Sequence, residues 1–209
     1  MLSRFLHIDD TTTWNAFRNG NHDAFAHIYQ AHFEVLYAYG KKFTYDDALI
    51  GDTLQQLFTE IWHKRARLGP TDHIKNYLYK SFRRSLLRRL RKKNGDITSE
   101  SEVAFPVSIS HEDHLIQEQL DIEQLEDLES AISMLSEKQR EVIYLKFYDG
   151  LSYAEISEIT GASNSQVYDL MYKALGSLRK KINKARISPS LSSSVITFIM
   201  ICNSFALLF

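Results

Sequence analysis

Apolar residues recur every three or four positions along most of the chain, which is the spacing of an α-helix that buries one face. In the N-terminal half this pattern predicts three helices, over residues 23–43, 46–67 and 72–93. The dipeptide Gly69-Pro70 ends the second of them, because proline disfavours a helical conformation in the residue before it. No segment shows the strict alternation of a half-buried strand. The sequence therefore predicts an all-α fold.

Helical spacing resumes at Leu115 and leads into three helix starts that share one signature. Each is a serine followed three residues later by Gln or Glu, in the pairs Ser136 and Gln139, Ser152 and Glu155, and Ser163 and Gln166. In such a capping box the serine oxygen accepts a backbone N–H of the first turn, and the longer side chain accepts the N–H of the serine. A short helix over 152–160, a turn at Gly161 and a longer helix predict a helix-turn-helix, which places its second helix in a major groove.

The helix that begins at Ser163 combines an apolar stripe with a polar face. The stripe consists of Val167, Met171, Ala174, Leu175, Leu178 and Ile182. The polar face consists of Ser163, Asn164, Ser165, Gln166, Tyr168, Asp169, Tyr172 and Lys173. Hydroxyls and amides near a helix N-terminus can reach base edges, and the helix dipole favours a phosphate there. This face predicts DNA binding; the other interpretation is a small helical bundle with a polar surface.

Charge is divided unevenly along the chain, although the net charge is only −1. Residues 80–93 contain eight basic side chains and no acid, whereas residues 94–137 contain twelve acids and no Lys or Arg. Residues 94–114 also contain Gly, Ser, Thr and Pro with little periodicity, which predicts an acidic linker between two helical domains.

The helix predicted over 72–93 carries the basic residues on one stripe. Its cations at helical spacing are Lys80, Arg83, Arg84, Arg88 and Arg91, and the same face continues toward the helix start through Lys75, Asn76 and Tyr79. Cations together with an amide and an aromatic ring suit a phosphate backbone whose bases have been opened. A charge run is often only a solvated face, but no acid within this run relieves the repulsion, which favours nucleic acid.

Other chemistry has little support in the sequence. Cys202 is the only cysteine, which excludes an internal disulfide and a cysteine-rich metal site. His111 and His114 have acidic neighbours and are interpreted as solvated side chains rather than metal ligands. We find no glycine-rich phosphate loop, nucleophile elbow or paired metal motif, so we expect no enzyme, cofactor or metal. The N-terminus has no charged-then-apolar leader, which favours the cytoplasm.

The C-terminal tail has its own pattern. Residues 195–209 are fifteen uncharged positions, which as a helix span about 22 Å, against about 30 Å for a bilayer core. Residues 190–194, which are four serines and Leu191, bring the length near twenty, and the preceding basic residues are Lys180, Lys181, Lys184 and Arg186. One hypothesis is a membrane contact. The other is a tail that packs on the protein itself or on an inhibitor, because Asn203 and Ser204 are polar.

From residue 16 to residue 182 the sequence resembles a bacterial RNA polymerase sigma factor of the extracytoplasmic-function group of the sigma-70 family. Such factors keep the second and fourth conserved regions, joined by a linker. The motif DTLQQLFTEIW at 52–62 is similar to the stretch that binds the polymerase clamp. YLYK at 77–80 with the following arginines resembles the element for the opened promoter, and LSYAEI at 151–156 resembles the first helix of the helix-turn-helix.

The resemblance implies an all-α architecture with sigma region 2 at 1–93, the acidic linker at 94–114, sigma region 4 at 115–186 and an apolar tail at 187–209. It implies that the core polymerase is bound by Asp52, Gln55, Gln56, Phe58 and Trp62. It implies that the minus-ten element is bound by Lys75, Asn76, Tyr79, Lys80, Arg83, Arg84 and Arg88. The polar face of 163–173 would read the minus-thirty-five element, and an anti-sigma factor is a further expected partner.

The sequence departs from the family pattern at two places. Arg84 stands where the family often has Asn, and Tyr168 and Leu170 stand where it often has Lys and Arg. Promoter preference is therefore not transferred from relatives. The alternative function is a stand-alone helix-turn-helix regulator, which would bind duplex DNA unaided but would leave 52–62 and the linker without a role.

Overall fold

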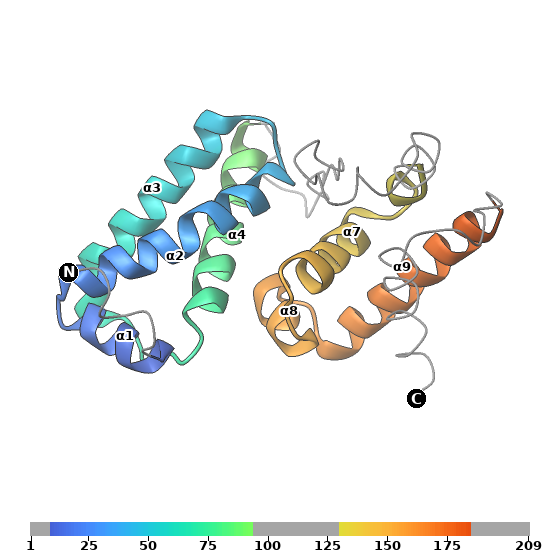
Figure 1. The fold of residues 1–209 in the computed structure, drawn as a ribbon. Helices are drawn as coiled ribbons and strands as arrows, with labels where there is room; N and C mark the ends of the chain where they lie inside the picture. The colour runs from blue at the N-terminus through green and yellow to red at the C-terminus, as the bar shows by residue number, and fades with distance from the viewer. Residues whose placement is uncertain (1–8, 94–129, 185–209) are drawn as a thin grey trace, which may run out of the picture. The chain divides into compact units, whose positions relative to one another are not determined.

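The computed structural model describes residues 9–93 and 130–184 of the chain, with side chains up to residue 180. Every regular element within these residues is a helix, so the predicted all-α class is confirmed (Figure 1). The helices assemble into two units, which are described separately below.

Contacts between Cα atoms assign the described residues 9–93 and 154–162 to the first unit, and 130–153 and 163–184 to the second. The grouping of 154–162 with the first unit differs from the boundaries expected from the sequence. Those boundaries, at 93, 114 and 186, stay predictions.

The first unit contains α1 (Asp10–Arg18), α2 (His22–Lys41), α3 (Asp47–Lys64), the short 3-10 helix η2 (Arg65–Arg67) and α4 (Ile74–Lys93). Asp9, Asn21 and Asp46 cap α1, α2 and α3, since each side-chain oxygen accepts a backbone N–H of the first turn. At the start of α4 the carboxylate of Asp10 accepts the N–H of Ile74 at 2.9 Å. The three predicted helices are present, and α1 is an additional short helix with its own cap.

The core of the first unit lies where α2 packs against α1, α3 and α4. Side chains that are at most 1% exposed include Trp14, Phe17, Ile28, Leu36, Tyr39, Leu54, Leu78 and Phe82. Gly40 of α2 permits the closest approach, because a Cβ atom there would lie 2.9 Å from Cγ2 of Ile50 and 3.0 Å from Cζ of Phe82. A larger residue at position 40 would therefore push α2 away from its neighbours.

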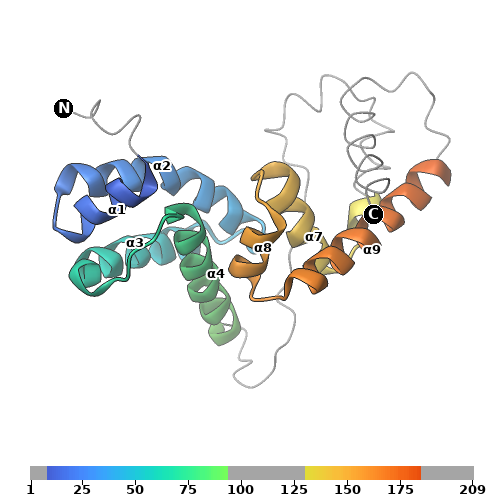
Figure 2. The same ribbon diagram turned by 90° about the horizontal axis from the view of Figure 1, so that it is seen from below.

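The second unit contains α7 (Glu137–Ile143), the π-helix η3 (Tyr144–Tyr148) and α9 (Asn164–Lys184). The short helix α8 (Tyr153–Thr160) precedes α9 in the chain (Figure 2). α7 packs on α9, and a buried cluster is formed by Ala131, Leu135, Ala174 and Leu178. Four residues of the apolar stripe predicted for α9, Val167, Met171, Ala174 and Leu178, are buried, and Leu175 is half-buried. Ile182 lies outside the residues whose side chains the structure describes.

Two of the three predicted capping boxes, at Ser136 and Ser163, are confirmed, while the one at Ser152 stays a prediction. The N–H of Ser136 donates to Gln139 Oε1 at 2.9 Å, and the N–H of Gln139 donates to Ser136 Oγ at 3.3 Å. The same two bonds join Ser163 and Gln166 at 2.8 and 3.3 Å. Between α8 and α9 the backbone turns at Gly161, whose φ of +76° is the left-handed conformation that favours glycine.

Within residues 9–93 and 130–184, no helix is long and apolar enough to cross a membrane. The apolar tail, the acidic linker, His111, His114 and Cys202 lie outside the described residues. The membrane contact of the tail therefore stays a prediction. No three His, Cys, Asp or Glu side chains in the described part of the chain come together as a metal site.

Candidate protein-binding and nucleic-acid interfaces

A groove of about 760 Å³ lies between α2 and α3. From α3 it is lined by four of the five residues expected to bind polymerase, which are Asp52, Gln55, Phe58 and Trp62. They meet because residues three and four positions apart share one side of a helix. Asp52 and Gln55 are exposed at this surface, whereas Phe58 is 3% exposed. The groove thus has an apolar floor beside exposed polar groups.

The opposite wall of this groove is aromatic. It is formed by Phe25, Tyr29 and Phe33 of α2, which follow one another at intervals of four residues. The Tyr29 ring lies 4.7 Å from that of Phe58, and the Phe25 ring lies 5.0 Å from that of Trp62, between centroids. Sequence analysis missed this wall, because aromatic residues at helical spacing are equally typical of a core.

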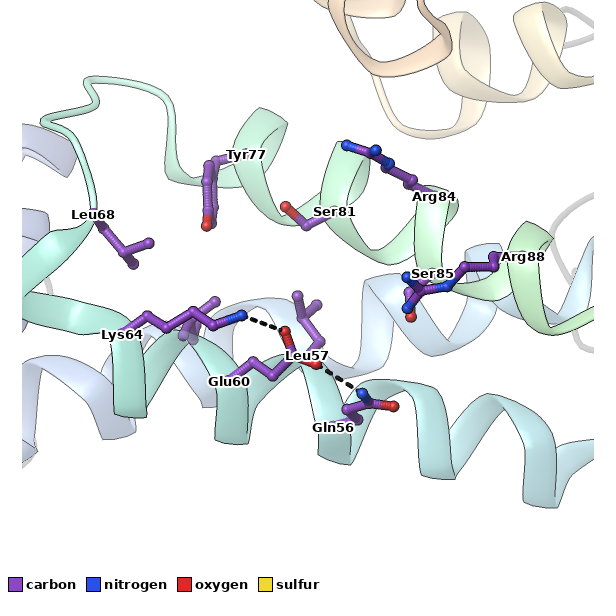
Figure 3. A pocket seen from close by; sticks show the side chains of 11 residues that line it. Gln56, Leu57, Glu60, Lys64, Leu68, Tyr77, Ser81, Arg84, Ser85 and Arg88 are labelled. Atoms are coloured by element: carbon purple, nitrogen blue, oxygen red, sulfur yellow. Dashed lines mark hydrogen bonds and ion pairs between the residues drawn. The ribbon is translucent and has the colours of Figure 1, made fainter.

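Gln56 does not lie in the α2–α3 groove, which corrects the expectation that it shares a face with Gln55. One residue along a helix turns the side chain by roughly 100°, and Gln56 accordingly faces α4. Its Nε2 donates to Glu60 Oε1 at 2.7 Å, and its Oε1 accepts a hydrogen bond from Nη2 of Arg89. Lys64 donates to the other oxygen of Glu60 at 2.9 Å (Figure 3). Gln56 therefore links α3 to α4.

A second groove, of about 250 Å³, lies between α3 and α4. Arg84 and Arg88 of α4 line it, with the hydroxyl-bearing side chains Tyr77, Ser81 and Ser85 beside them (Figure 3). Lys80, Arg84 and Arg88 are exposed, while Lys75, Arg83 and Arg91 are partly buried. The exposed cationic surface of α4 is thus narrower than the stripe predicted from the sequence.

Asn76 and Tyr79 are buried, with 1% and 0% of their surface exposed, and this corrects their expected place on the DNA-facing surface. The Tyr79 ring packs against that of Tyr39 in α2, with centroids 5.0 Å apart. α4 contacts both α2 and α3, so it buries a wider sector than a helix that packs against one neighbour. Neither residue can stack on or hydrogen-bond to DNA from this position.

An acid lies among the cations of the α3–α4 groove. Hydrogen bonds to Glu60, first from Lys64 and then from Gln56, hold the pKa of its carboxyl below the ordinary value. Glu60 is therefore negative at neutral pH, and the charge of nearby Arg88 acts in the same direction. Phosphate groups are expected to favour Lys80 and Arg84 over the bottom of the groove, where Glu60 repels them.

All eight residues predicted to face DNA from α9 and its cap are exposed. They are Ser163, Asn164, Ser165, Gln166, Tyr168, Asp169, Tyr172 and Lys173. On the other side of the same helix Val167, Met171, Ala174 and Leu178 are buried. Gln166 Oε1 accepts the N–H of Ser163 in the cap, so contact with a base would come from its amide nitrogen.

Comparison with known proteins covers both halves of the chain. Residues 125–178 match the family described as sigma-70, region 4. RNA polymerase sigma factor SigV of Bacillus subtilis (strain 168) is 27% identical over 159 residues, which are 76% of this chain and 89% of SigV. ECF RNA polymerase sigma factor SigK of Mycolicibacterium vanbaalenii is 24% identical over 164 residues, which are 78% of this chain and 84% of SigK.

The fold is also similar to a solved structure. Sigma factor RpoE of Bartonella quintana, in complex with the anti-sigma factor NepR, superposes with a TM-score of 0.53 at 21% identity, over 76% of this chain and 96% of RpoE. The SigV and SigK matches each span about three quarters of this chain, more than region 4 occupies. They therefore favour a factor that directs transcription initiation over a stand-alone helix-turn-helix regulator. Over about three quarters of its length this chain is therefore similar to RNA polymerase sigma factors, including one of the extracytoplasmic-function group, and its residues 125–178 match region 4 of the sigma-70 family.

Proposed function

We propose that this sigma factor binds the core polymerase through the α2–α3 groove. The observation that carries the proposal is the position of Asp52 and Gln55 beside the buried ring of Phe58. An apolar centre beside exposed polar groups is the arrangement of a protein interface. The groove suits a helix of the polymerase clamp that inserts apolar side chains between α2 and α3 and places a cation near Asp52.

We propose that α4 binds the opened minus-ten element through Lys80, Arg84 and Arg88. All three are exposed on one side of the helix, and each cation that meets a phosphate releases a counter-ion. Lys75 and Arg83 are partly buried, so we assign them a weaker contribution. Asn76 and Tyr79 are left out of the proposal because they are buried.

We propose that α9 reads the minus-thirty-five element in the major groove. Its exposed side presents hydroxyls, amides and tyrosine rings within two turns of the N-terminus, where helix-turn-helix proteins contact base edges. Lys173 is the cation at the far end of this face and would contact a phosphate.

The polymerase contact can be tested with a matched pair of charge reversals. Asp52→Lys is expected to weaken binding of the full chain to core polymerase by about tenfold, because it places a cation where the partner is expected to have one. Glu34→Lys is the control, since Glu34 is an exposed acid of α2 that does not line the groove. Equal affinities for the two variants would refute the assignment. Run-off transcription with core polymerase provides the functional readout, and it should fall only for Asp52→Lys.

We infer that an anti-sigma factor restrains this chain, as NepR is bound to RpoE in the solved complex. We also infer that the chain works in the cytoplasm, where the polymerase is found, and that it has no catalytic activity or cofactor of its own. Polymerase supplies the chemistry, while this chain supplies the surfaces that bind the promoter.

A further inference from the structure

A stack of three side chains in the second unit involves the recognition helix. Tyr153 is the first residue of α8, and its ring centroid lies 4.3 Å from that of Tyr168 in α9, with 32° between the ring planes. The ammonium of Lys146 in η3 lies 5.0 Å from the centroid of the Tyr153 ring. Lys146 also donates a hydrogen bond to the backbone oxygen of Leu151 at 3.2 Å. We call Lys146, Tyr153 and Tyr168 the tyrosine stack.

The tyrosine stack restricts the side chain of Tyr168. An exposed tyrosine on a helix can exchange between staggered rotamers, but contact with the Tyr153 ring favours one of them. Tyr168 remains 45% exposed, so the rest of its ring can still contact a ligand. Tyr172, one turn further along α9, is 80% exposed, and it contacts no other ring in the described part of the chain. Of these two tyrosines on the DNA-facing surface, Tyr168 is therefore the one held in place.

An immobilised ring suits one feature of the major groove in particular. The C5-methyl group of thymine is the apolar mark that distinguishes this base there, and apolar side chains read it by contact. We propose that Tyr153 is a positioning residue, which holds the ring of Tyr168 against a thymine methyl in the minus-thirty-five element, and that Lys146 holds Tyr153. This inference rests on the proposed function of α9.

The expected change in DNA affinity follows from two effects. Burial of one methyl group accounts for about fourfold in affinity. Ordering one side chain in advance of binding accounts for about twofold to tenfold. Loss of the Tyr153 ring should therefore remove the preference for thymine at one position, and should do so without changing any residue that touches DNA in the proposal.

The test uses the full chain with core RNA polymerase. A promoter library randomised over the minus-thirty-five element is first selected with the wild-type holoenzyme. Each thymine in the selected element is then replaced singly by deoxyuridine, which lacks the methyl group, and holoenzyme binding is measured. The variants are Tyr153→Ser, which removes the ring, and Tyr153→Phe, which keeps it. Tyr148→Ser is the matched control, because Tyr148 is 59% exposed and its ring stacks 4.8 Å from that of Tyr144 in η3.

We expect deoxyuridine at one position to weaken binding of the wild type by about fourfold. Tyr153→Ser should lose this dependence, while Tyr153→Phe and Tyr148→Ser should keep it. The inference would be overturned if no deoxyuridine substitution weakened binding of the wild type. It would also be overturned if Tyr153→Ser lowered the affinity equally for all DNA variants. If circular dichroism shows that Tyr153→Ser does not fold, Tyr153→Leu takes its place with the same expectation. Failure to select any preferred element would instead overturn the proposed role of α9, and this inference with it.

Discussion

Gly40 provides a direct test of how closely α2 must approach its neighbours. In a Gly40→Ala variant the new Cβ would lie 2.9 Å from Cγ2 of Ile50 and 3.0 Å from Cζ of Phe82. Neither atom can move easily, because Cγ2 is attached to the branched Cβ of Ile50 and Phe82 is completely buried. Either α2 moves away from α3 and α4, or the side chains of Ile50 and Phe82 leave their preferred rotamers.

The free-energy change for this variant has two opposing parts. Overpacking a core costs about 1–3 kcal/mol. Alanine in place of glycine stabilises a helix interior by about 1 kcal/mol, and less at Gly40, which lies in the last turn of α2. Gly40→Ala should therefore lower the free energy of unfolding by about 1–2 kcal/mol. Gly51→Ala in α3 is the matched control, because no atom lies within 4 Å of its added Cβ. That variant should raise the free energy of unfolding by about 1 kcal/mol.

Tryptophan fluorescence during urea or thermal unfolding measures this difference in the full chain. Both tryptophans of the sequence, Trp14 and Trp62, belong to the first unit, so the signal reports the unit that contains both glycines. A change of 1 kcal/mol shifts the melting temperature of a domain of this size by about 4–8 °C. The two variants should move it in opposite directions. Stabilisation of Gly40→Ala to the same degree as Gly51→Ala would refute the close packing at Gly40.

Three further predictions concern DNA binding and the pH dependence of stability. Arg84→Ala should reduce the salt dependence of holoenzyme binding to opened promoter DNA by about one counter-ion. Lys93→Ala should leave it unchanged, because Lys93 pairs with Asp46 at 2.6 Å. Equal slopes of affinity against salt concentration for the two variants would contradict this. Lys173→Ala should weaken binding to all promoters and lower the salt slope, while Gln166→Ala should change sequence preference; a uniform loss by Gln166→Ala across a promoter library would count against it. Hydrogen bonds from Lys93 and then from the backbone N–H of Leu49 hold the pKa of Asp46 below its ordinary value. The ionised carboxylate therefore stabilises the fold at pH values above the ordinary pKa, and this stabilisation is lost as pH falls through the lowered pKa of the folded state. Thermal melts should show a smaller acid-induced loss of stability for Asp46→Asn, and an unchanged pH dependence would disprove this role.

The exposed face of α9 could be predicted from the sequence because the helix presents a single apolar stripe to its core. Val167, Met171, Ala174 and Leu178 define that stripe, and the residues between them must face outward. The capping box at Ser163 is equally local, since it depends on two side chains three residues apart. Features of this kind need no knowledge of other segments.

The exposed face of α4 could not be predicted in the same way. The helix α4 packs against two partners, α2 and α3. The width of its buried sector depends on the angles between helices that lie far apart in the sequence. Asn76 and Tyr79 fell inside that sector although their residue types suit a nucleic-acid surface. Gln56 likewise turned toward Arg89 rather than toward Gln55, because α4 lies on that side of α3.

The sequence alone determined the longer helices, the capping boxes at Ser136 and Ser163, the split between cationic and acidic segments and the resemblance to sigma factors, because these depend on neighbouring residues and on motifs with fixed spacing. Only the tertiary structure decided which aromatic residues of α2 complete the α2–α3 groove, which cations of α4 remain exposed, and that the ring of Tyr153 packs against that of Tyr168. These features depend on contacts between helices, which periodicity along one helix cannot specify.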